Sequence, residues 1–301
     1  MEQLLRELER VLNKNQILLK EPMDRHTTFR VGGPADLFLT PEIHQLAETI
    51  RILRKYQTDV TVIGNGSNLL VGDQGIRGAV IEMGRQSAEI LSAGEYVTAQ
   101  AGALLSKTAG EAYKNGLSGM EFAAGIPGSV GGAIVMNAGA YGGEMKDIVS
   151  SVTVLDKEGN IKELTCGQME FGYRHSCIEE KGYLVLETKF HLKKGEPEQI
   201  RIRMEELKEQ RIAKQPLEYP SAGSTFRRPK GYFAGKLIMD AGLSGFSIGG
   251  AQVSKKHCGF VINTGGAAAA DVVAVIHHIQ KTVKEKFDVN LETEVKMIGT
   301  F

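Results

Sequence analysis

A run of small residues between positions 124 and 143 constrains this chain more than any other feature of its sequence. It consists of residues 124–133 (AGIPGSVGGA) and 137–143 (NAGAYGG). Glycine makes up 36 of the 301 residues, about 12%, against an average near ~7%. Side chains this small cannot fill a core by themselves. The backbone therefore forms either tight turns between short strands or a wall around a large, extended ligand, and the ligand is the favoured interpretation.

A second glycine loop, residues 62–70 (VIGNGSNLL), follows a short β-branched run. Successive backbone N–H groups in such a loop can bind phosphate without a positive charge. It is not a dinucleotide fingerprint, because Leu69 stands where the third glycine is required. Gly231–Lys236 is not a Walker loop either, because its gap is wrong and Leu237 follows the lysine. An ordinary hairpin turn remains the alternative.

Charge and composition exclude several classes of protein. Lys plus Arg (36) equals Asp plus Glu (36), which removes the electrostatic support for binding nucleic acid or a membrane surface. The uncharged stretch 122–143 is long enough to span a bilayer, but its seven glycines and one proline predict buried loops. Residues 1–12 carry charges among their leucines, unlike a secretory signal.

Three cysteines without a CxxC pair and seven histidines without metal spacing favour a reducing compartment and no metal site. We therefore expect a cytoplasmic protein that is a monomer or a weak homo-oligomer, with no nucleic-acid or membrane partner.

Hydrophobic periodicity predicts an α+β chain. Apolar residues recur at helical spacing over residues 2–12, 41–56, 104–114 and 269–287, and residues 198–214 predict a charged helix. Strands are predicted at 60–63, 79–81, 96–99, 151–155 and 183–192. The turn Gly195-Glu196-Pro197 marks a boundary. We expect two subdomains, residues 1–90 and 91–195, followed by a third domain, residues 196–301.

Four ordered motifs together carry a family resemblance: 28–35 (TFRVGGPA), 64–69 (GNGSNL), 125–132 (GIPGSVGG) and 137–142 (NAGAYG). In these the chain, from about residue 27 to its end, resembles the UDP-N-acetylenolpyruvoylglucosamine reductase family. The resemblance implies two α/β subdomains that bind FAD in the manner of vanillyl-alcohol oxidase, and a C-terminal α+β substrate-binding domain. The chain lacks the insertion that carries a substrate-clamping tyrosine, so it resembles the shorter type of the family.

The resemblance also implies a reaction and a cofactor. NADPH would supply hydride through FAD to reduce UDP-N-acetylglucosamine enolpyruvate to UDP-N-acetylmuramate for peptidoglycan. Residues 65–69 and 125–129 would hold the FAD diphosphate. The full set of cofactor-binding residues implied in this way is Arg30, Gly64, Asn65, Gly66, Ser67, Asn68, Leu69, Gly125, Ile126, Pro127, Gly128, Ser129, Gly131, Ala138, Gly139 and Tyr141.

Reduction of an enol ether conjugated to a carboxylate requires the protein to hold the carboxylate, stabilise an enolate and donate a proton. Ser224 lies in the loop 220–226 (PSAGSTF), where most serines are ordinary turn residues. The resemblance assigns it as the proton donor. There is no GxSxG elbow, so a hydrolase nucleophile is disfavoured.

Two further residues are candidates for the enolate. Glu294 lies in the alternating segment 291–296 (LETEVK), which predicts a strand with Glu292 on the same face; a solvated edge strand is the alternative. The resemblance assigns Glu294 as the carboxyl group that assists the enolate. Arg174, in 171–176 (FGYRHS), offers a planar guanidinium that suits a carboxylate, and Tyr173 would contact substrate; a surface arginine is the alternative.

A substrate diphosphate requires cations. Arg211, Lys236 and Lys296 are the chosen candidates among several basic residues of the C-terminal third, although each is equally compatible with a solvated surface charge. Two other functions stay open at this point: an oxidase of the same flavin fold that uses oxygen, and a catalytically silent nucleotide-binding module.

Overall fold

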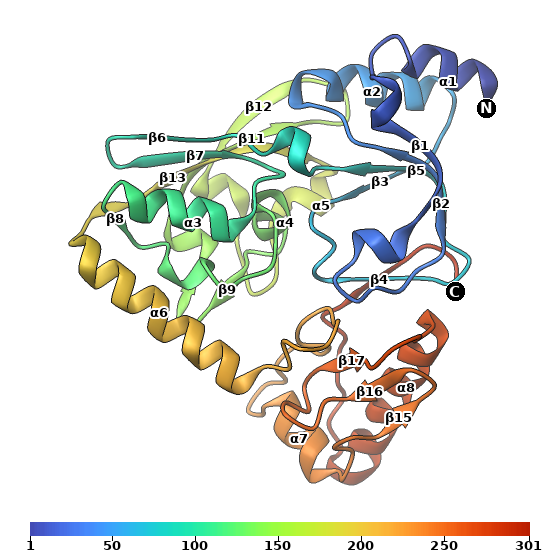
Figure 1. Ribbon diagram of the computed structural model, residues 1–301, viewed down its shortest axis with the longest axis vertical. Coiled ribbons are helices and arrows are strands. Elements are labelled where there is room, and N and C mark those ends of the chain that lie inside the picture. Colours follow the sequence, from blue (N-terminus) through green and yellow to red (C-terminus); the bar gives the residue numbers. More distant parts are fainter. The chain divides into compact units, whose positions relative to one another are not determined.

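The computed structural model describes all residues from 1 to 301, and their packing divides the chain into two units (Figure 1). Unit 1 comprises residues 1–18, 38–65 and 79–211, and unit 2 comprises residues 19–37, 66–78 and 212–301. The chain passes between the units several times, so neither unit is one continuous segment. The expected division at residues 90 and 195 remains a prediction.

The first part of unit 1 combines helices with a parallel strand pair. The leucines of α1 (Glu2–Leu8) and α2 (Ile43–Lys55) that face inward are buried, and the two helices pack together. A four-stranded sheet has the order β1-β2-β5-β3, in which β3 and β5 are parallel. Its strands are β1 (Ile17–Pro22), β2 (Pro34–Leu39), β3 (Val60–Ile63) and β5 (Ile76–Glu82). The unit boundaries fall within β1, β2 and β5.

The second part of unit 1 is a five-stranded antiparallel sheet of order β12-β11-β13-β7-β6. Its strands are β6 (Ile90–Ala93), β7 (Tyr96–Gln100), β11 (Val149–Leu155), β12 (Ile161–Thr165) and β13 (Leu184–His191). Val97, Val152 and Phe190 are among its fully buried side chains. The strands predicted near residues 96, 151 and 183 are confirmed as β7, β11 and β13.

Helices α3 (Leu105–Lys114) and α4 (Val130–Val135) pack against strands of this sheet. The unit also contains α5 (Cys177–Lys181) and α6 (Pro197–Lys214) as far as Arg211. Two short pairs join β8 (Leu117–Ser118) to β14 (Lys193–Lys194) and β9 (Gly139–Ala140) to β10 (Gly143–Glu144). Helix α4 corrects the expectation that residues 122–143 form only loops. Ser129 begins the helix, and its side chain accepts a hydrogen bond from the Gly132 N–H, which offsets the low helix propensity of two early glycines.

Unit 2 is built around a long amphipathic helix, α8 (Ala269–Phe287), with the bounds that the sequence predicts. Its buried face, which includes Val272, Ile276 and Ile279, packs on a three-stranded sheet of order β15-β16-β17 (Figure 1). These strands are β15 (Ser247–Ile248), β16 (Ala251–Val253) and β17 (Val261–Asn263), and helix α7 (Ala234–Asp240) also packs against α8. Asp73 accepts hydrogen bonds from the first two N–H groups of α8, at 2.7 and 2.9 Å.

The predicted strand over residues 291–296 is wrong in its bounds. Only Lys296–Ile298 forms a strand, β18, which runs parallel to β4 (Leu69–Val71). Before it, Thr293 makes a single bridge to Phe226, and the chain bends at Val295. Backbone bonding to two different partners therefore overrides the alternating pattern.

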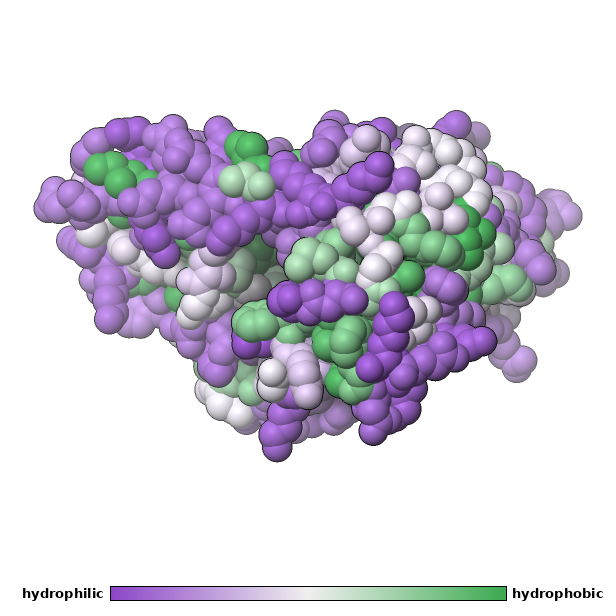
Figure 2. All heavy atoms as spheres, turned by 90° about the horizontal axis from the view of Figure 1, so that it is seen from below, coloured by the Kyte–Doolittle hydropathy of each residue, from purple (hydrophilic) through white to green (hydrophobic).

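The surface of the protein is mainly hydrophilic on the face shown in Figure 2, where green hydrophobic residues lie among purple ones. Exposed apolar side chains include Tyr173, Phe233 and Ile161. No helix combines the length and the apolar character that crossing a membrane requires.

Candidate functional site

Residues 64–65 of the loop 62–70 meet residues 127–129 of the glycine run within unit 1, although the two are far apart in the sequence. Asn65 follows β3, and its side-chain amide donates a hydrogen bond to the Pro127 carbonyl at 2.6 Å. Gly64 lies so close to Ser129 that a Cβ on Gly64 would overlap the Ser129 hydroxyl. Gly64 is therefore a position of close approach, where any side chain would push the two loops apart.

Backbone donors are left over where these loops meet. No backbone carbonyl accepts a hydrogen bond from the N–H groups of Asn65, Gly128 or Ser129, and Ser129 is buried. A buried N–H group normally has a partner, which makes the Ser129 donor unusual, whereas Asn65 is exposed and Gly128 half-buried. Neighbouring N–H groups without an acceptor in the chain suit an anionic ligand. Gly131 differs, because its N–H donates to the Ala101 carbonyl at 2.8 Å and its Cα packs against Ala101. Packing alone explains that glycine.

The flanking residues Gly125 and Ile126 lie in the same loop, and the Ile126 N–H closes a turn on the Ala123 carbonyl. Arg211, at the end of the unit 1 segment of α6, approaches this loop: its Cδ would lie 3.3 Å from a Cβ on Gly125. Burial lowers the pKa of the Arg211 guanidinium, an effect that Tyr141 opposes. Arg211 therefore lies beside the glycine run of residues 124–143.

Asn137 links the glycine run of residues 124–143 to the turn that carries Arg174. It is buried, with a left-handed φ of 42°, and its amide donates to the Glu144 carboxylate at 2.7 Å and to the Gly172 carbonyl at 3.0 Å. Its side-chain oxygen accepts the Lys146 N–H at 3.0 Å. Asn is one of the few residues that tolerate this backbone conformation and can also bond in this way.

Arg174 itself lies in a tight turn in which Gly172 and His175 exchange backbone hydrogen bonds of 3.1 and 3.3 Å. Its φ is 54°, an uncommon value for a residue with a side chain, and the guanidinium lies 5.2 Å from the centre of the Tyr173 ring. Tyr173 is 58% exposed. The turn thus presents an adjacent cation and aromatic ring on unit 1.

Other predicted cofactor residues lie near Asn137 in the sequence. The Ala138 N–H donates to the Ala133 carbonyl at 2.8 Å, and Gly139 forms β9. Tyr141 has a φ of 54° and is 38% exposed. These residues form a turn that is distinguished by its left-handed backbone at Asn137 and Tyr141 and not by any side chain.

Ser224 lies in unit 2, exposed, after Gly223, whose φ is 76°. The next residue, Thr225, is buried and donates its N–H to the Gly259 carbonyl at 2.8 Å. Its hydroxyl accepts the Val261 N–H at 2.9 Å. The loop therefore exposes one hydroxyl, that of Ser224, on a firmly bonded backbone.

Glu294 is anchored beside this loop within unit 2. Its N–H donates to the Thr225 carbonyl at 2.8 Å, and its carbonyl accepts the Asn68 amide at 3.0 Å. The Lys296 N–H donates to the Asn68 carbonyl at 2.9 Å, and Leu69 pairs with Lys296 in the β4–β18 ladder. The structure thus brings three predicted site segments together: residues 68–69, the Ser224 loop and residues 294–296.

The remaining residues predicted to contact cofactor or substrate lie in unit 2. Each has a different local environment. Gly66 has a φ of 61°, and a Cβ there would overlap the His26 carbonyl, so packing requires glycine whether or not a ligand is present. Ser67 follows it and is half-buried. Arg30 is exposed, with a φ of 53°. Lys236 is exposed on α7 and pairs with Asp240 at 2.6 Å.

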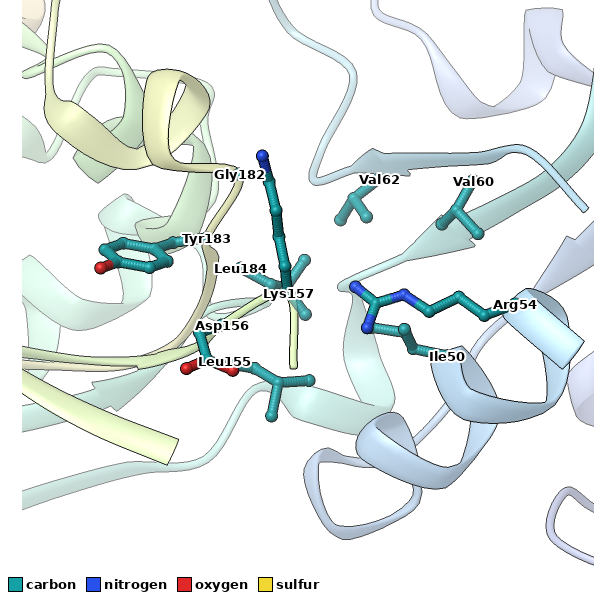
Figure 3. Close-up of a pocket in the computed structure, with 10 residues that line it drawn as sticks. All are labelled: Ile50, Arg54, Val60, Val62, Leu155, Asp156, Lys157, Gly182, Tyr183 and Leu184. Carbon is teal, nitrogen blue, oxygen red and sulfur yellow. The ribbon is translucent and has the colours of Figure 1, made fainter. Parts of the chain in front are cut away.

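A cavity of about 610 Å³ also lies within unit 1 (Figure 3). Val60 and Val62 project toward it from β3, and the side chains of Arg54 and Lys157 extend along it. The sequence did not indicate these residues, because exposed charges on a helix and a turn look like ordinary solvated charges. The remaining lining residues are Ile50, Leu155, Asp156, Gly182, Tyr183 and Leu184.

The acidic, histidine and cysteine side chains do not gather into any group of three that could hold a metal ion. Cys166, Cys177 and Cys258 are free thiols, and burial raises the pKa of Cys166 and Cys177.

Two family models match the chain. The FAD binding domain matches residues 34–165, and the C-terminal domain of UDP-N-acetylenolpyruvoylglucosamine reductase matches residues 215–298. Among whole proteins, the reductase of that name from Agathobacter rectalis is 54% identical over 297 residues, covering 95% of each chain. That from Caldanaerobacter subterraneus is 51% identical, covering 98% of each chain.

Solved structures agree with these matches. The crystal structure of UDP-N-acetylenolpyruvylglucosamine reductase from Thermus caldophilus has a TM-score of 0.79 at 36% identity, covering 93% of this chain and 97% of its own. An alkyldihydroxyacetonephosphate synthase has a TM-score of 0.51 at 17% identity, covering 64% of this chain and 40% of its own. The latter likeness concerns the fold alone.

Proposed function

The chain belongs to the UDP-N-acetylenolpyruvoylglucosamine reductase family, and from that premise we propose which residues carry out the family's reaction. The chain is an FAD-dependent oxidoreductase that uses NADPH to reduce UDP-N-acetylglucosamine enolpyruvate to UDP-N-acetylmuramate for peptidoglycan synthesis. The predicted fold class, cofactors and reaction are confirmed, and the alternatives of an oxygen-using oxidase and a silent binding module are disfavoured.

The diphosphate of FAD is assigned to the place where the glycine loops of unit 1 meet. The unpartnered N–H groups of Asn65, Gly128 and Ser129 support this assignment, because they can hold an anion without a cation. The close approach of Gly64 to Ser129 fits a cradle that is lined by backbone. For the other predicted cofactor residues, among them Arg30, Ser67 and Tyr141, contact with FAD is proposed from the family resemblance alone.

The adenosine end of FAD is assigned to the cavity of unit 1 shown in Figure 3. Val62 lines this cavity from β3, and Gly64 follows directly after the end of that strand, so the cavity and the glycine loop adjoin in the sequence. The apolar side chains suit a flat base, and Arg54 and Lys157 supply hydrogen-bond donors. Val62→Asp should therefore weaken FAD binding, whereas unchanged FAD affinity would contradict the assignment.

FAD, when bound, supplies to the enolpyruvyl group the hydride that NADPH provides. The protein must then stabilise the negative charge that spreads into the substrate carboxylate, and must protonate the adjacent carbon. Ser224 is assigned as the proton donor, because its exposed hydroxyl is a weak acid but the enolate is a strong base. Glu294 is assigned as the acid or hydrogen-bond donor at the enolate, and Arg174 as the fork that holds the carboxylate.

The substrate's diphosphate and sugar are assigned to Tyr173, Arg211, Lys236 and Lys296. Lys236 must exchange its exposed pair with Asp240 for a phosphate, which costs little because surface ion pairs are weak. Arg211 is half-buried next to Gly125, so its charge is screened less by water than that of Lys236. Of these cations, Arg211 has the strongest structural support.

A cytoplasmic location and a monomer or weak homo-oligomer are also proposed. Three unpaired thiols support the location, because thiols persist in a reducing compartment.

The observation that best supports the catalytic roles is the hydrogen bond from the Glu294 N–H to the Thr225 carbonyl at 2.8 Å. It holds Glu294 against the residue that follows Ser224. The purified holoenzyme tests the reaction under anaerobic conditions. NADPH should bleach the flavin, and addition of the enolpyruvyl substrate should restore its colour. Bleaching without recovery would contradict the function, and recovery driven by oxygen alone would favour an oxidase.

A further inference from the structure

His257 occupies the turn between β16 and β17 in unit 2 and has no role in the function proposed above. Ser254 begins the turn, and its hydroxyl accepts the N–H groups of Lys256 and His257, each at 3.2 Å. The His257 ring is half-buried and packs edge-on against Phe260, with ring centres 4.9 Å apart. Gly235 of α7 adjoins the same ring: a Cβ there would lie 3.4 Å from His257 Cε1. The ring is thus fixed from two sides.

A chain of hydrogen bonds leads from this ring to the reactive residues. The Gly259 N–H donates to His257 Nδ1 at 3.2 Å, and the Gly259 carbonyl accepts the Thr225 N–H at 2.8 Å. The Thr225 carbonyl in turn accepts the Glu294 N–H at 2.8 Å. Thr225 follows Ser224 directly, so both proposed reactive residues are attached to this chain of bonds.

We propose that His257 is a positioning residue for the reduction step: by accepting the Gly259 N–H, it sets the backbone that places Ser224 and Glu294. The imidazole acts as an acceptor here and touches neither substrate nor cofactor in this account. A displacement of about 1 Å at a reactive group can cost roughly 10²-fold in rate, so a single acceptor at this place has a large effect.

Only the neutral ring can fill this role, since a protonated imidazole carries N–H groups on both nitrogens. Burial lowers the pKa of His257, which favours the neutral ring. Because Nδ1 accepts a hydrogen bond, the proton of the neutral ring resides on Nε2. The geometry and the protonation state therefore agree.

Two nearly isosteric replacements separate the acceptor from the shape of the side chain. In His257→Asn the side-chain oxygen can accept the N–H two residues on, as Asn does in turns, whereas the leucine of His257→Leu cannot. We measure flavin bleaching by NADPH and flavin recovery with the enolpyruvyl substrate, both anaerobically and per bound flavin. His257→Leu should keep its bleaching rate and lose recovery by roughly 10- to 100-fold, and His257→Asn should stay within a few-fold of the parent.

Equal recovery in the Asn and Leu variants would overturn the proposal, and so would an equal loss of bleaching and recovery in the leucine variant. If His257→Leu does not fold, the smaller pair His257→Ser and His257→Ala repeats the comparison, because the serine hydroxyl also accepts the N–H two residues on.

This inference rests on the roles proposed for Ser224 and Glu294, and one further variant separates the two. If Ser224→Ala recovers normally, the proposed role of Ser224 fails and this inference fails with it. If Ser224→Ala loses recovery while His257→Leu keeps it, only the inference about His257 is wrong.

Discussion

The glycine loops of unit 1 and the reactive loop of unit 2 both contain backbone and side-chain hydrogen bonds, but the residues proposed to act in them take part in different ways. In unit 1 the side chains of Asn65 and Asn137 bond to the carbonyls of Pro127 and Gly172. In unit 2 the bonds of Thr225 to Gly259 and of Glu294 to Thr225 join backbone to backbone. Replacing the side chain of Ser224 or Glu294 therefore leaves these backbone bonds in place, whereas replacing Asn65 or Asn137 removes the bond itself.

The largest expected effect comes from a change that leaves the backbone bonds of unit 2 intact. Glu294→Gln keeps the shape of the side chain and still offers a hydrogen-bond donor, the amide, but it removes the acidic proton. Flavin recovery with substrate should slow by about 10²–10⁴-fold, the range typical of a positioned acid. Substrate affinity, measured by titration, and the denaturation midpoint should change little. If affinity falls in proportion while bound substrate turns over normally, Glu294 serves binding only.

Asn137→Ala should act on the fold of unit 1. It removes three hydrogen bonds, takes away the acceptor of the Lys146 N–H and places alanine at a φ of 42°. The free energy of unfolding should fall by about 3 kcal/mol, with loss of bound flavin. Asn137→Gly, which suits the φ but makes no side-chain bond, should recover about 1 kcal/mol of this in denaturant titrations. A parental midpoint for Asn137→Ala would show that the turn is held by other contacts.

Asn65→Ala should have a smaller effect, because the side chain is exposed and makes one hydrogen bond to a carbonyl. Loss of that bond should weaken FAD binding by about 1 kcal/mol, roughly five-fold, without changing the unfolding midpoint. Asn115→Ala, at the exposed end of α3, serves as the control and should leave FAD affinity unchanged. Equal FAD affinity in the two variants would separate Asn65 from the cofactor.

The smallest effect is expected at a glycine that has no structural requirement. A Cβ on Gly110, inside α3, would meet no atom within 4 Å. Gly110→Ala should therefore raise the free energy of unfolding by up to ~1 kcal/mol, measured by thermal or denaturant unfolding, with both half-reactions unchanged. A loss of stability would show that the helix needs this glycine.

The long periodic elements, such as α8, could be predicted from the sequence, because the buried residues of an amphipathic helix recur at helical spacing. Sequence reasoning failed at residues 291–296, where alternation predicts a strand but bonds to two different partners divide the segment. It also could not separate Gly66, which the His26 carbonyl requires, from Gly64, which the approach of Ser129 requires. Both positions exclude a Cβ, and only the fold reveals which atom fills the space.

The approach of residue 65 to residue 127, the place of Arg211 beside Gly125 and the bond between residues 225 and 294 were likewise beyond prediction. Contacts between residues so distant in the sequence depend on tertiary packing, which local patterns do not encode. The family resemblance identified these residues as candidates, and the structure shows the contacts between them.

The central claim is that Ser224 serves the substrate and not the flavin, and the two half-reactions of Ser224→Ala test it most directly. The backbone bonds of Thr225 do not involve the Ser224 hydroxyl, so the loop should keep its conformation. In anaerobic stopped-flow experiments, flavin bleaching by NADPH should proceed at the parental rate, and recovery with the enolpyruvyl substrate should slow by at least ~10²-fold. Recovery at the parental rate, or an equal loss in both half-reactions, would contradict the account.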